Sequence, residues 1–177
     1  MEPHVPTART ENAIAWARQH LGTESYASRC LAFVEDAYER PNELELFGGD
    51  FAAESAELYA ARENAAAPPP AGAFVFYDYT GEMLGRRQNW GHVGLCVGDG
   101  LVIHAWDRVR TDHCREIQDL AVPPGWDAPR WLGWTPTERI LRGCRPKDWS
   151  PEGDAAAAAR RMQAARFGDG TATAATG

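Results

Sequence analysis

The sequence lacks the segments that would carry it into or across a membrane. Its 177 residues contain no run of about 18 apolar residues, the length that a membrane-spanning helix needs. The first residues, Met1–Pro6, show no basic segment followed by an apolar stretch, so no secretory signal is recognised. We therefore expect a cytoplasmic protein without a membrane span, with export by a non-standard route as the alternative.

A net basic charge and CxxC pairs of cysteines are also absent. The formal net charge is −7, which disfavours a surface that neutralises nucleic-acid phosphates. None of the four cysteines belongs to a CxxC pair, and no residues have the spacing of zinc ligands. We expect no nucleic-acid partner, no metal and no organic cofactor, and the sequence does not indicate an oligomeric state.

The composition is that of a globular protein, with 44% hydrophobic and 24% charged residues. Residues 1–10 are expected to form a loose arm, and residues 11–148 a single domain. Residues 149–177 are expected to form an Ala/Arg-rich helix followed by a disordered tail.

Helical patterns fill the first half of the domain, and strand patterns fill the second half. The apolar spacing predicts helices over residues 10–21, 30–40 and 53–64. Short apolar runs predict strands over residues 73–77, 92–97, 101–106, 116–120 and 139–142. The polar stretch 80–89 is expected to be a mobile loop. This order of elements indicates an α+β fold.

The residues with the clearest chemistry are one cysteine and two histidines. Cys30 opens the second predicted helix, where the positive end of the helix dipole favours a thiolate. His92 on a nearby strand can take the thiol proton, and His104 can orient His92. This is the arrangement of nucleophile, base and orienting group that covalent catalysis requires.

The turn Gly98-Asp99-Gly100 decides whether the two histidines meet. With a three-residue loop or a bulge, His104 faces Gly94, and His92 lies diagonally opposite His104 on the same face of the sheet. A plain two-residue turn would shift the register by one residue and separate the histidines. The catalytic interpretation therefore predicts a three-residue loop or a bulge.

These residues resemble the NlpC-type cysteine peptidases, papain-like bacterial enzymes that mostly cut cell-wall peptides. The matching pieces are Cys30, the strand at residues 73–77, His92-Val93-Gly94 and Val102-Ile103-His104-Ala105. The resemblance covers roughly residues 11–145 and implies a papain-like fold, with N-terminal helices and the nucleophile helix packed on an antiparallel β-sheet. It implies Cys30 as nucleophile, His92 as general base and His104 as the orienting residue. It also implies Tyr26 as the tyrosine upstream of the nucleophile.

The nucleophile motif departs from this family. Cell-wall members usually have Asp-Cys-Ser-Gly, whereas this chain has Arg29-Cys30-Leu31-Ala32. An arginine favours an anion instead of the ammonium group that the family's aspartate helps to bind. Besides Tyr26 and Arg29, the expected substrate-binding residues are Trp90 and Trp106, which flank the histidines.

The expected reaction is hydrolysis of an amide bond in a peptide or small amide through a thioester on Cys30. Cell-wall fragments are among the candidate substrates. Acyl transfer to an amine would use the same site. A CHAP-type amidase is a second enzymatic alternative, although that family prefers an acidic or amide third residue over a histidine. The non-enzymatic alternative is a catalytically silent binding protein on the same scaffold.

Overall fold

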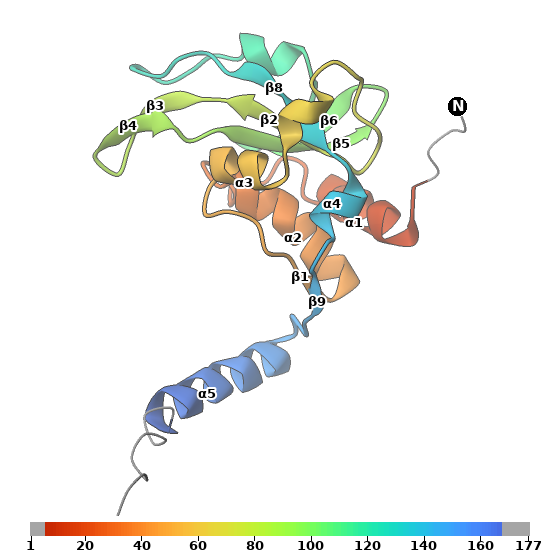
Figure 1. Ribbon diagram of the computed structural model, residues 1–177, viewed down its shortest axis with the longest axis vertical. Helices are drawn as coiled ribbons and strands as arrows, with labels where there is room; N and C mark the ends of the chain where they lie inside the picture. The colour runs from red at the N-terminus through yellow and green to blue at the C-terminus, as the bar shows by residue number, and fades with distance from the viewer. Residues whose placement is uncertain (1–5, 168–177) are drawn as a thin grey trace, which may run out of the picture.

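The computed structural model describes residues 6–167. Residues 1–5 of the expected arm and residues 168–177 of the expected tail lie outside the described residues. A layer of helices covers one face of a twisted antiparallel sheet, and the last helix, α5 (Pro151–Phe167), extends away from this body (Figure 1). The α+β arrangement expected from the sequence is confirmed.

The central sheet has five strands in the order β7-β6-β5-β2-β8, and every pair is antiparallel. Its strands are β2 (Phe74–Asp78), β5 (His92–Gly98), β6 (Leu101–Ala105), β7 (Val109–His113) and β8 (Arg130–Thr135). Strand β2 is apolar at consecutive positions because both of its faces are covered. Phe74 and Phe76 pack in the core shared with the helices, while Val75 and Tyr77 pack in a smaller core on the opposite face.

The helical layer consists of α1 (Ala8–Gln19), α2 (Cys30–Asn42) and α3 (Ala52–Leu58). Helix α1 begins earlier than expected because Thr7 caps it, accepting a hydrogen bond from the backbone N–H of Thr10. Helix α2 packs against α1, β5 and β6 and buries Phe33, Val34 and Ala37 completely. The N-terminus of α2, where Cys30 lies, is therefore held against the strands that carry both histidines.

The register of the β5–β6 hairpin matches the expectation for catalysis. Its turn has two residues, Asp99 and Gly100, with φ values of 52° and 75°. A bulge between Cys96 and Gly98 then shifts the register. Beyond the bulge, Leu95 pairs with Ile103, so that Gly94 faces His104. Of the two alternatives that the catalytic interpretation required, a three-residue loop or a bulge, the structure has the bulge.

Several predicted elements were wrong. The stretch 80–89 is not a loop but a hairpin of β3 (Thr80–Met83) and β4 (Arg86–Asn89), which turns at Leu84 and Gly85 with positive φ values. The third predicted helix breaks at Ala60, which has a φ of 50°, and continues as the short helix η1 (Ala61–Asn64).

Two predicted strands are short helices. The segment near residue 117 is η2 (Glu116–Asp119), and the segment near residue 140 is α4 (Thr137–Ile140). In α4 the buried residues Thr137 and Ile140 are three positions apart, which is a helical spacing and not a strand alternation. The remaining short strands, β1 (Leu44–Glu45) and β9 (Arg145–Pro146), pair with each other beside the helical layer.

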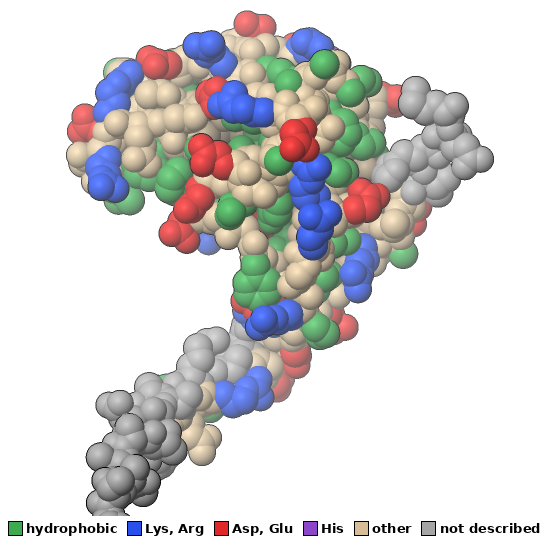
Figure 2. All heavy atoms as spheres, in the orientation of Figure 1, with side chains coloured by type: hydrophobic (Ala, Val, Ile, Leu, Met, Phe, Trp, Pro, Cys, Tyr) green, Lys and Arg blue, Asp and Glu red, His purple; other side chains and the backbone are tan. Residues whose placement is uncertain are grey.

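No helix within residues 6–167 is long and apolar enough to cross a membrane. Acidic and basic side chains are interspersed over the face that Figure 2 shows.

Candidate active site

A cleft of about 1050 Å³ opens where the start of α2 meets β5 and β6. It is lined by Cys30 and His92, and also by Arg29, Trp90 and Trp106. Residues 49–52, which lead into α3, and residues 121–123 form further parts of its walls. The fold thus brings most of the predicted site residues to a single cleft.

Cys30 is the first residue of α2 and is partly exposed to the cleft. Burial raises the pKa of its thiol, while hydrogen bonding from the backbone of Val93, Leu31 and Cys30 itself acts to lower it. The sequence predicted a thiolate from the helix dipole alone. That expectation was wrong because the start of α2 is packed into the protein, where desolvation disfavours the charged form.

The two histidines form a direct hydrogen bond. Nε2 of His92 lies 2.8 Å from Nδ1 of His104, and the two ring planes are inclined at 80°. Both residues are buried, with 3% and 0% of their surface exposed. Gly94 makes this approach possible, because a Cβ atom there would lie 3.0 Å from the Cβ atom of His104.

The sequence analysis missed the next residue in this series of hydrogen bonds, Asp112 on β7. Nε2 of His104 lies 2.9 Å from Oδ2 of Asp112. Arg110 donates to the same carboxylate twice, from Nε at 2.7 Å and from Nη2 at 3.1 Å. In the β6–β7 pairing, His104 faces Arg110, and Asp112 is the diagonal neighbour. The signal in the sequence was the two-residue spacing of Arg110 and Asp112, which places both on one face of a strand.

The hydrogen bonds fix the tautomers of both histidines. Burial acts to raise the pKa of Asp112, but hydrogen bonds from His104 and Arg110 outweigh it and hold the pKa below its usual value. Ionised Asp112 can only accept, so His104 donates from Nε2 and accepts at Nδ1. His92 must then donate from Nε2, which leaves a lone pair on its Nδ1 atom.

Both imidazoles are neutral at neutral pH. Burial and the neighbouring His104 lower the pKa of His92 well below its usual range. Burial also lowers the pKa of His104, although Asp112 acts to raise it. Among the residues that the structure describes, no hydrogen bond joins the Cys30 thiol to His92, although both line the cleft. At neutral pH the Cys30 thiol and the His92 imidazole, which line the same cleft, are therefore both uncharged.

Tyr26 does not reach the cleft. Its hydroxyl donates to Oδ2 of Asp36 at 2.6 Å, and its ring packs against Trp16 and Phe33. Arg29 does line the cleft, and its guanidinium lies 5.6 Å from the centre of the Tyr26 ring. Arg29 therefore lies at the cleft, whereas Tyr26 does not.

Tyr79 supplies an aromatic hydroxyl in the cleft, which the sequence analysis did not find. Burial raises its pKa, and so does the charge of a Cys30 thiolate, because the two groups are neighbours. The ring of Tyr79 lies 5.1 Å from that of Trp106 and 4.5 Å from that of Trp126. The pattern offered little signal for Tyr79, because it lies between two strands, just after β2.

Trp90 and Trp106 form parts of the cleft wall. The ring of Trp106 stands edge-on to His92, 5.0 Å away and at 89°. Trp90 is fixed by a hydrogen bond from Nε1 to the carbonyl of Gly81 at 3.1 Å and by contact with Phe51. In the described part of the chain, no group of three His, Cys, Asp or Glu side chains is arranged to hold a metal ion.

No protein-family model matches the sequence, and a comparison with curated proteins finds no match. Among the solved structures that are similar to the chain are the following two. One is RipD from Mycobacterium tuberculosis, described as a non-catalytic NlpC/p60 domain protein with an adaptation to peptidoglycan-binding function. The match has a TM-score of 0.46 and 12% identity, and covers 74% of this chain and 98% of RipD.

The other is NlpC2 from Trichomonas vaginalis, with a TM-score of 0.46 and 22% identity. The match covers 75% of this chain and 49% of that protein, so the chain spans about half of NlpC2.

Proposed function

We propose that this protein is a cysteine hydrolase that cleaves an amide bond through a thioester on Cys30. The observation that carries the proposal is the chain of hydrogen bonds from Asp112 through His104 to His92, which ends in the cleft that Cys30 also lines. In this proposal His92 is the general base, His104 orients it, and Asp112 fixes the tautomer of His104.

Because thiol and imidazole are both neutral at rest, the proton moves during the attack. Nδ1 of His92 takes the proton of Cys30 as the sulfur bonds to the substrate carbonyl carbon. The carbonyl electrons move to its oxygen, and backbone N–H groups near the sulfur, such as that of Cys30, stabilise this oxyanion. His92 then gives the proton to the leaving amine as the C–N bond breaks.

The second half of the reaction frees the enzyme. Water attacks the thioester carbonyl while His92 removes one of its protons. The carbon–sulfur bond breaks, the acid leaves, and the proton returns to the sulfur of Cys30. If an amine takes the place of water, the same steps give acyl transfer.

The residues that line the cleft favour a substrate whose acyl group is neutral or acidic. Arg29 precedes the nucleophile and lines the cleft, and its positive charge favours an acidic group over a free amine in the substrate. The aromatic walls at Trp90, Trp106 and Tyr79 suit a peptide or an amide with apolar surface. Cell-wall fragments with a blocked or acidic terminus fit this description.

A catalytically silent binding protein is the second candidate. It is favoured by one observation, namely that Cys30 and His92 are not hydrogen-bonded in the structure. Catalytic hydrogen bonds are often loose without substrate and tighten only in the complex, so this geometry does not remove the enzymatic proposal. A CHAP-type amidase is disfavoured because the third residue is His104.

Incubation with peptidoglycan fragments and a panel of small amides tests the proposal, with products followed by mass spectrometry. Cys30→Ser is the matched control, since it replaces only the sulfur. Added hydroxylamine intercepts a thioester as a hydroxamate and so reports the intermediate directly. Hydrolysis that needs Cys30 supports the proposal. Binding without turnover across the whole panel would instead favour the silent protein.

A further inference from the structure

Three aromatic rings meet on the sheet side of the cleft. The ring of Tyr79 lies 5.1 Å from that of Trp106, with the two planes at 39°, and 4.5 Å from that of Trp126, with the planes at 36°. All three residues line the cleft, and each keeps part of its surface exposed. These three residues, the Tyr79 cluster, therefore present one continuous apolar surface to a substrate.

The β3–β4 hairpin fixes Trp126 in the Tyr79 cluster. A Cβ atom added to Gly81 on β3 would overlap the Trp126 ring, so the glycine allows the ring to lie directly on the strand. The backbone N–H of Asp127 donates to the carbonyl of Thr80 at 2.9 Å, and the Asp127 carboxylate pairs with Arg87 on β4 at 3.1 Å. The segment that carries Trp126 is therefore attached to the hairpin at both of its strands.

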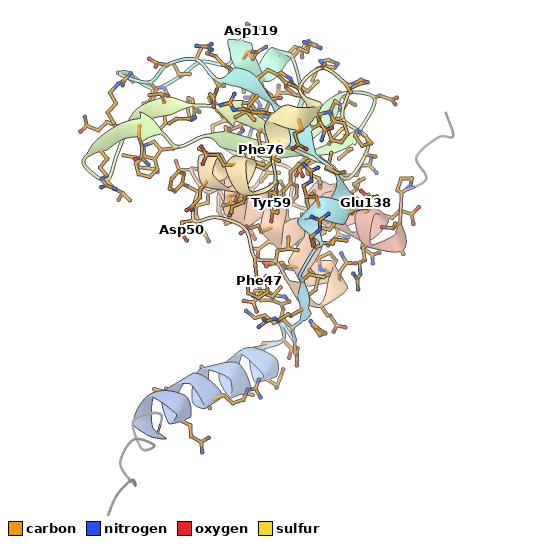
Figure 3. All side chains as sticks on the ribbon, in the orientation of Figure 1. Phe47, Asp50, Tyr59, Phe76, Asp119 and Glu138 are labelled. Atoms are coloured by element: carbon orange, nitrogen blue, oxygen red, sulfur yellow. The ribbon has the colours of Figure 1, made fainter. Side chains whose placement is uncertain are left out.

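The helical layer forms the other side of the cleft. Residues 49–52 line it there, and Figure 3 shows Asp50 at the edge of that layer, below the β3–β4 hairpin in this view. Phe51 and Trp90 join the two sides, with ring centres 5.4 Å apart. A substrate group that enters the cleft between the two layers therefore meets the Tyr79 cluster on its sheet side.

The Tyr79 cluster adjoins the base of the proposed mechanism. The ring of His92 lies 5.0 Å from that of Trp106 and 6.4 Å from that of Tyr79. In the proposed reaction His92 gives the proton to the leaving nitrogen, so this nitrogen must lie within hydrogen-bond reach of the imidazole. The group that is bonded to the leaving nitrogen is then brought next to Trp106 and Tyr79.

We propose that the Tyr79 cluster is the subsite for an aromatic residue on the leaving-amine side of the scissile bond. Removing a ring from water against apolar surface is favourable, and aromatic pairs gain further from edge-to-face and offset contacts. Three rings at different inclinations offer both kinds of contact. The inference rests on the proposed function, which makes His92 the proton donor to the leaving amine, and it adds the chemical class of the residue that follows the scissile bond.

The partition of acetylated Cys30 between water and added amines tests this subsite. p-Nitrophenyl acetate donates the acetyl group at about pH 8.5, where the amines are mostly uncharged, and parallel reactions of Cys30→Ala give the background. Phenylalaninamide should capture the acetyl group about fivefold or more better than alaninamide, which differs from it only by the phenyl ring. Cyclohexylalaninamide, which has similar bulk without an aromatic ring, should fall between the two. Because the products come from one intermediate, their ratio does not depend on the rate of acylation.

Trp126→Leu should remove most of the preference for phenylalaninamide, because it takes away the ring that packs on Tyr79. Trp149→Leu is the matched control, since Trp149 packs on Arg40 and Lys147 and is not among the residues that line the cleft. It should leave the preference within about twofold of the wild type. Equal capture by phenylalaninamide and alaninamide, or equal effects of the two variants, would overturn the subsite. Equal capture by phenylalaninamide and cyclohexylalaninamide would overturn its preference for an aromatic ring.

Nuclear magnetic resonance of the indole N–H groups tests the same subsite without any acylation. Phenylalaninamide should shift the Nε1–H signals of Trp106 and Trp126 and leave that of Trp149 unchanged, whereas alaninamide should shift none of the three. Signals that do not move, or that move equally at Trp149, would overturn the subsite. If these shifts occur but Cys30 cannot be acylated, the aromatic site stands and the hydrolase proposal fails.

Discussion

Nε2 of His104 lies 2.9 Å from Oδ2 of Asp112, and this contact determines which nitrogen of His92 is free to act as a base. The carboxylate holds the proton of His104 on Nε2, and His104 in turn holds that of His92 on Nε2. Nδ1 of His92 is left as the acceptor. A residue on β7 with no place in the sequence-based triad thus determines the tautomer of His92, the base of the proposed mechanism.

Asp112→Ala is expected to lower kcat by about 10–100-fold with little change in KM, because it removes the group that fixes the tautomers without touching the substrate. Steady-state kinetics and circular dichroism measure the effect and verify the fold. Thr111→Ala, at the exposed position between Arg110 and Asp112, is the control and should be neutral. Equal losses in the two variants would mean that β7 acts only through stability.

His92→Ala should reduce turnover more than His104→Ala. The base moves the proton itself, a contribution of about 10²–10⁴-fold, whereas the orienting residue only fixes its ring. Because His104 is completely buried, His104→Gln is the better folded variant for comparison. Turnover that is unchanged in the His104 variants would assign the third role to another residue.

The four thiols should react with iodoacetamide in the order of their exposure. Cys30 and Cys144 are partly exposed, whereas Cys96 and Cys114 are buried. Labelling of Cys30 should become faster as the pH rises towards and above 9, since burial raises the pKa of this thiol. Peptide mapping measures the extent of labelling at each cysteine. Early labelling of Cys96 would contradict the packing described here.

The sequence was sufficient for the parts of the site that follow from local pattern. Cys30 at a helix start, the hairpin and the diagonal relation of His92 and His104 all follow from spacing and turn chemistry. Asp112 was missed because β7 carries a single buried apolar residue, Val109, and so lacks the alternation that marks a strand; without a strand, the spacing of Arg110 and Asp112 had no meaning.

Two other features depend on packing and not on spacing. Tyr26 precedes the nucleophile by four residues, but the loop turns it towards α1 and Asp36 instead of the cleft. The pKa of Cys30 depends on how deeply the start of α2 is packed, which no local pattern reveals. The sequence analysis therefore placed Cys30 correctly at the start of a helix but predicted a thiolate where burial favours the neutral thiol.

Glu35→Gln should make the free energy of unfolding less sensitive to alkaline pH. The folded pKa of about 8 exceeds the ordinary value of 4.5, so the stability that the protonated carboxyl contributes is present below about pH 4.5 and lost as the pH rises through 8. The amide variant stays neutral throughout. The free energy of unfolding, measured with urea, should fall less between about pH 5 and about pH 8.5 in the variant than in the wild type, by about 1 kcal/mol or more.

The control for this shift is Glu57→Gln, which removes the same charge from an exposed position on α3. It should change the free energy of unfolding almost equally at the two pH values. A Glu35→Gln profile that runs parallel to that of the wild type would show that the carboxyl ionises normally.

Arg29 is expected to select against a free amine beside the scissile bond. Stem peptides with a free N-terminal L-Ala should be cleaved weakly, and their N-acetylated forms should be cleaved better. Arg29→Asp should narrow or reverse this preference in kcat/KM. Efficient cleavage of the free-amine peptides, unaffected by Arg29→Asp, would restore the ordinary cell-wall specificity.

Acylation of Cys30 is the most direct test of the account. The protein is mixed with p-nitrophenyl acetate at neutral pH, quenched in acid and analysed by peptide mass spectrometry, with Cys144 as the second partly exposed thiol in the same chain. The account predicts an acetyl thioester on Cys30 that forms much faster than on Cys144 and that requires His92. Equal acetylation of the two cysteines, or a rate on Cys30 that is unchanged by His92→Ala, would contradict it.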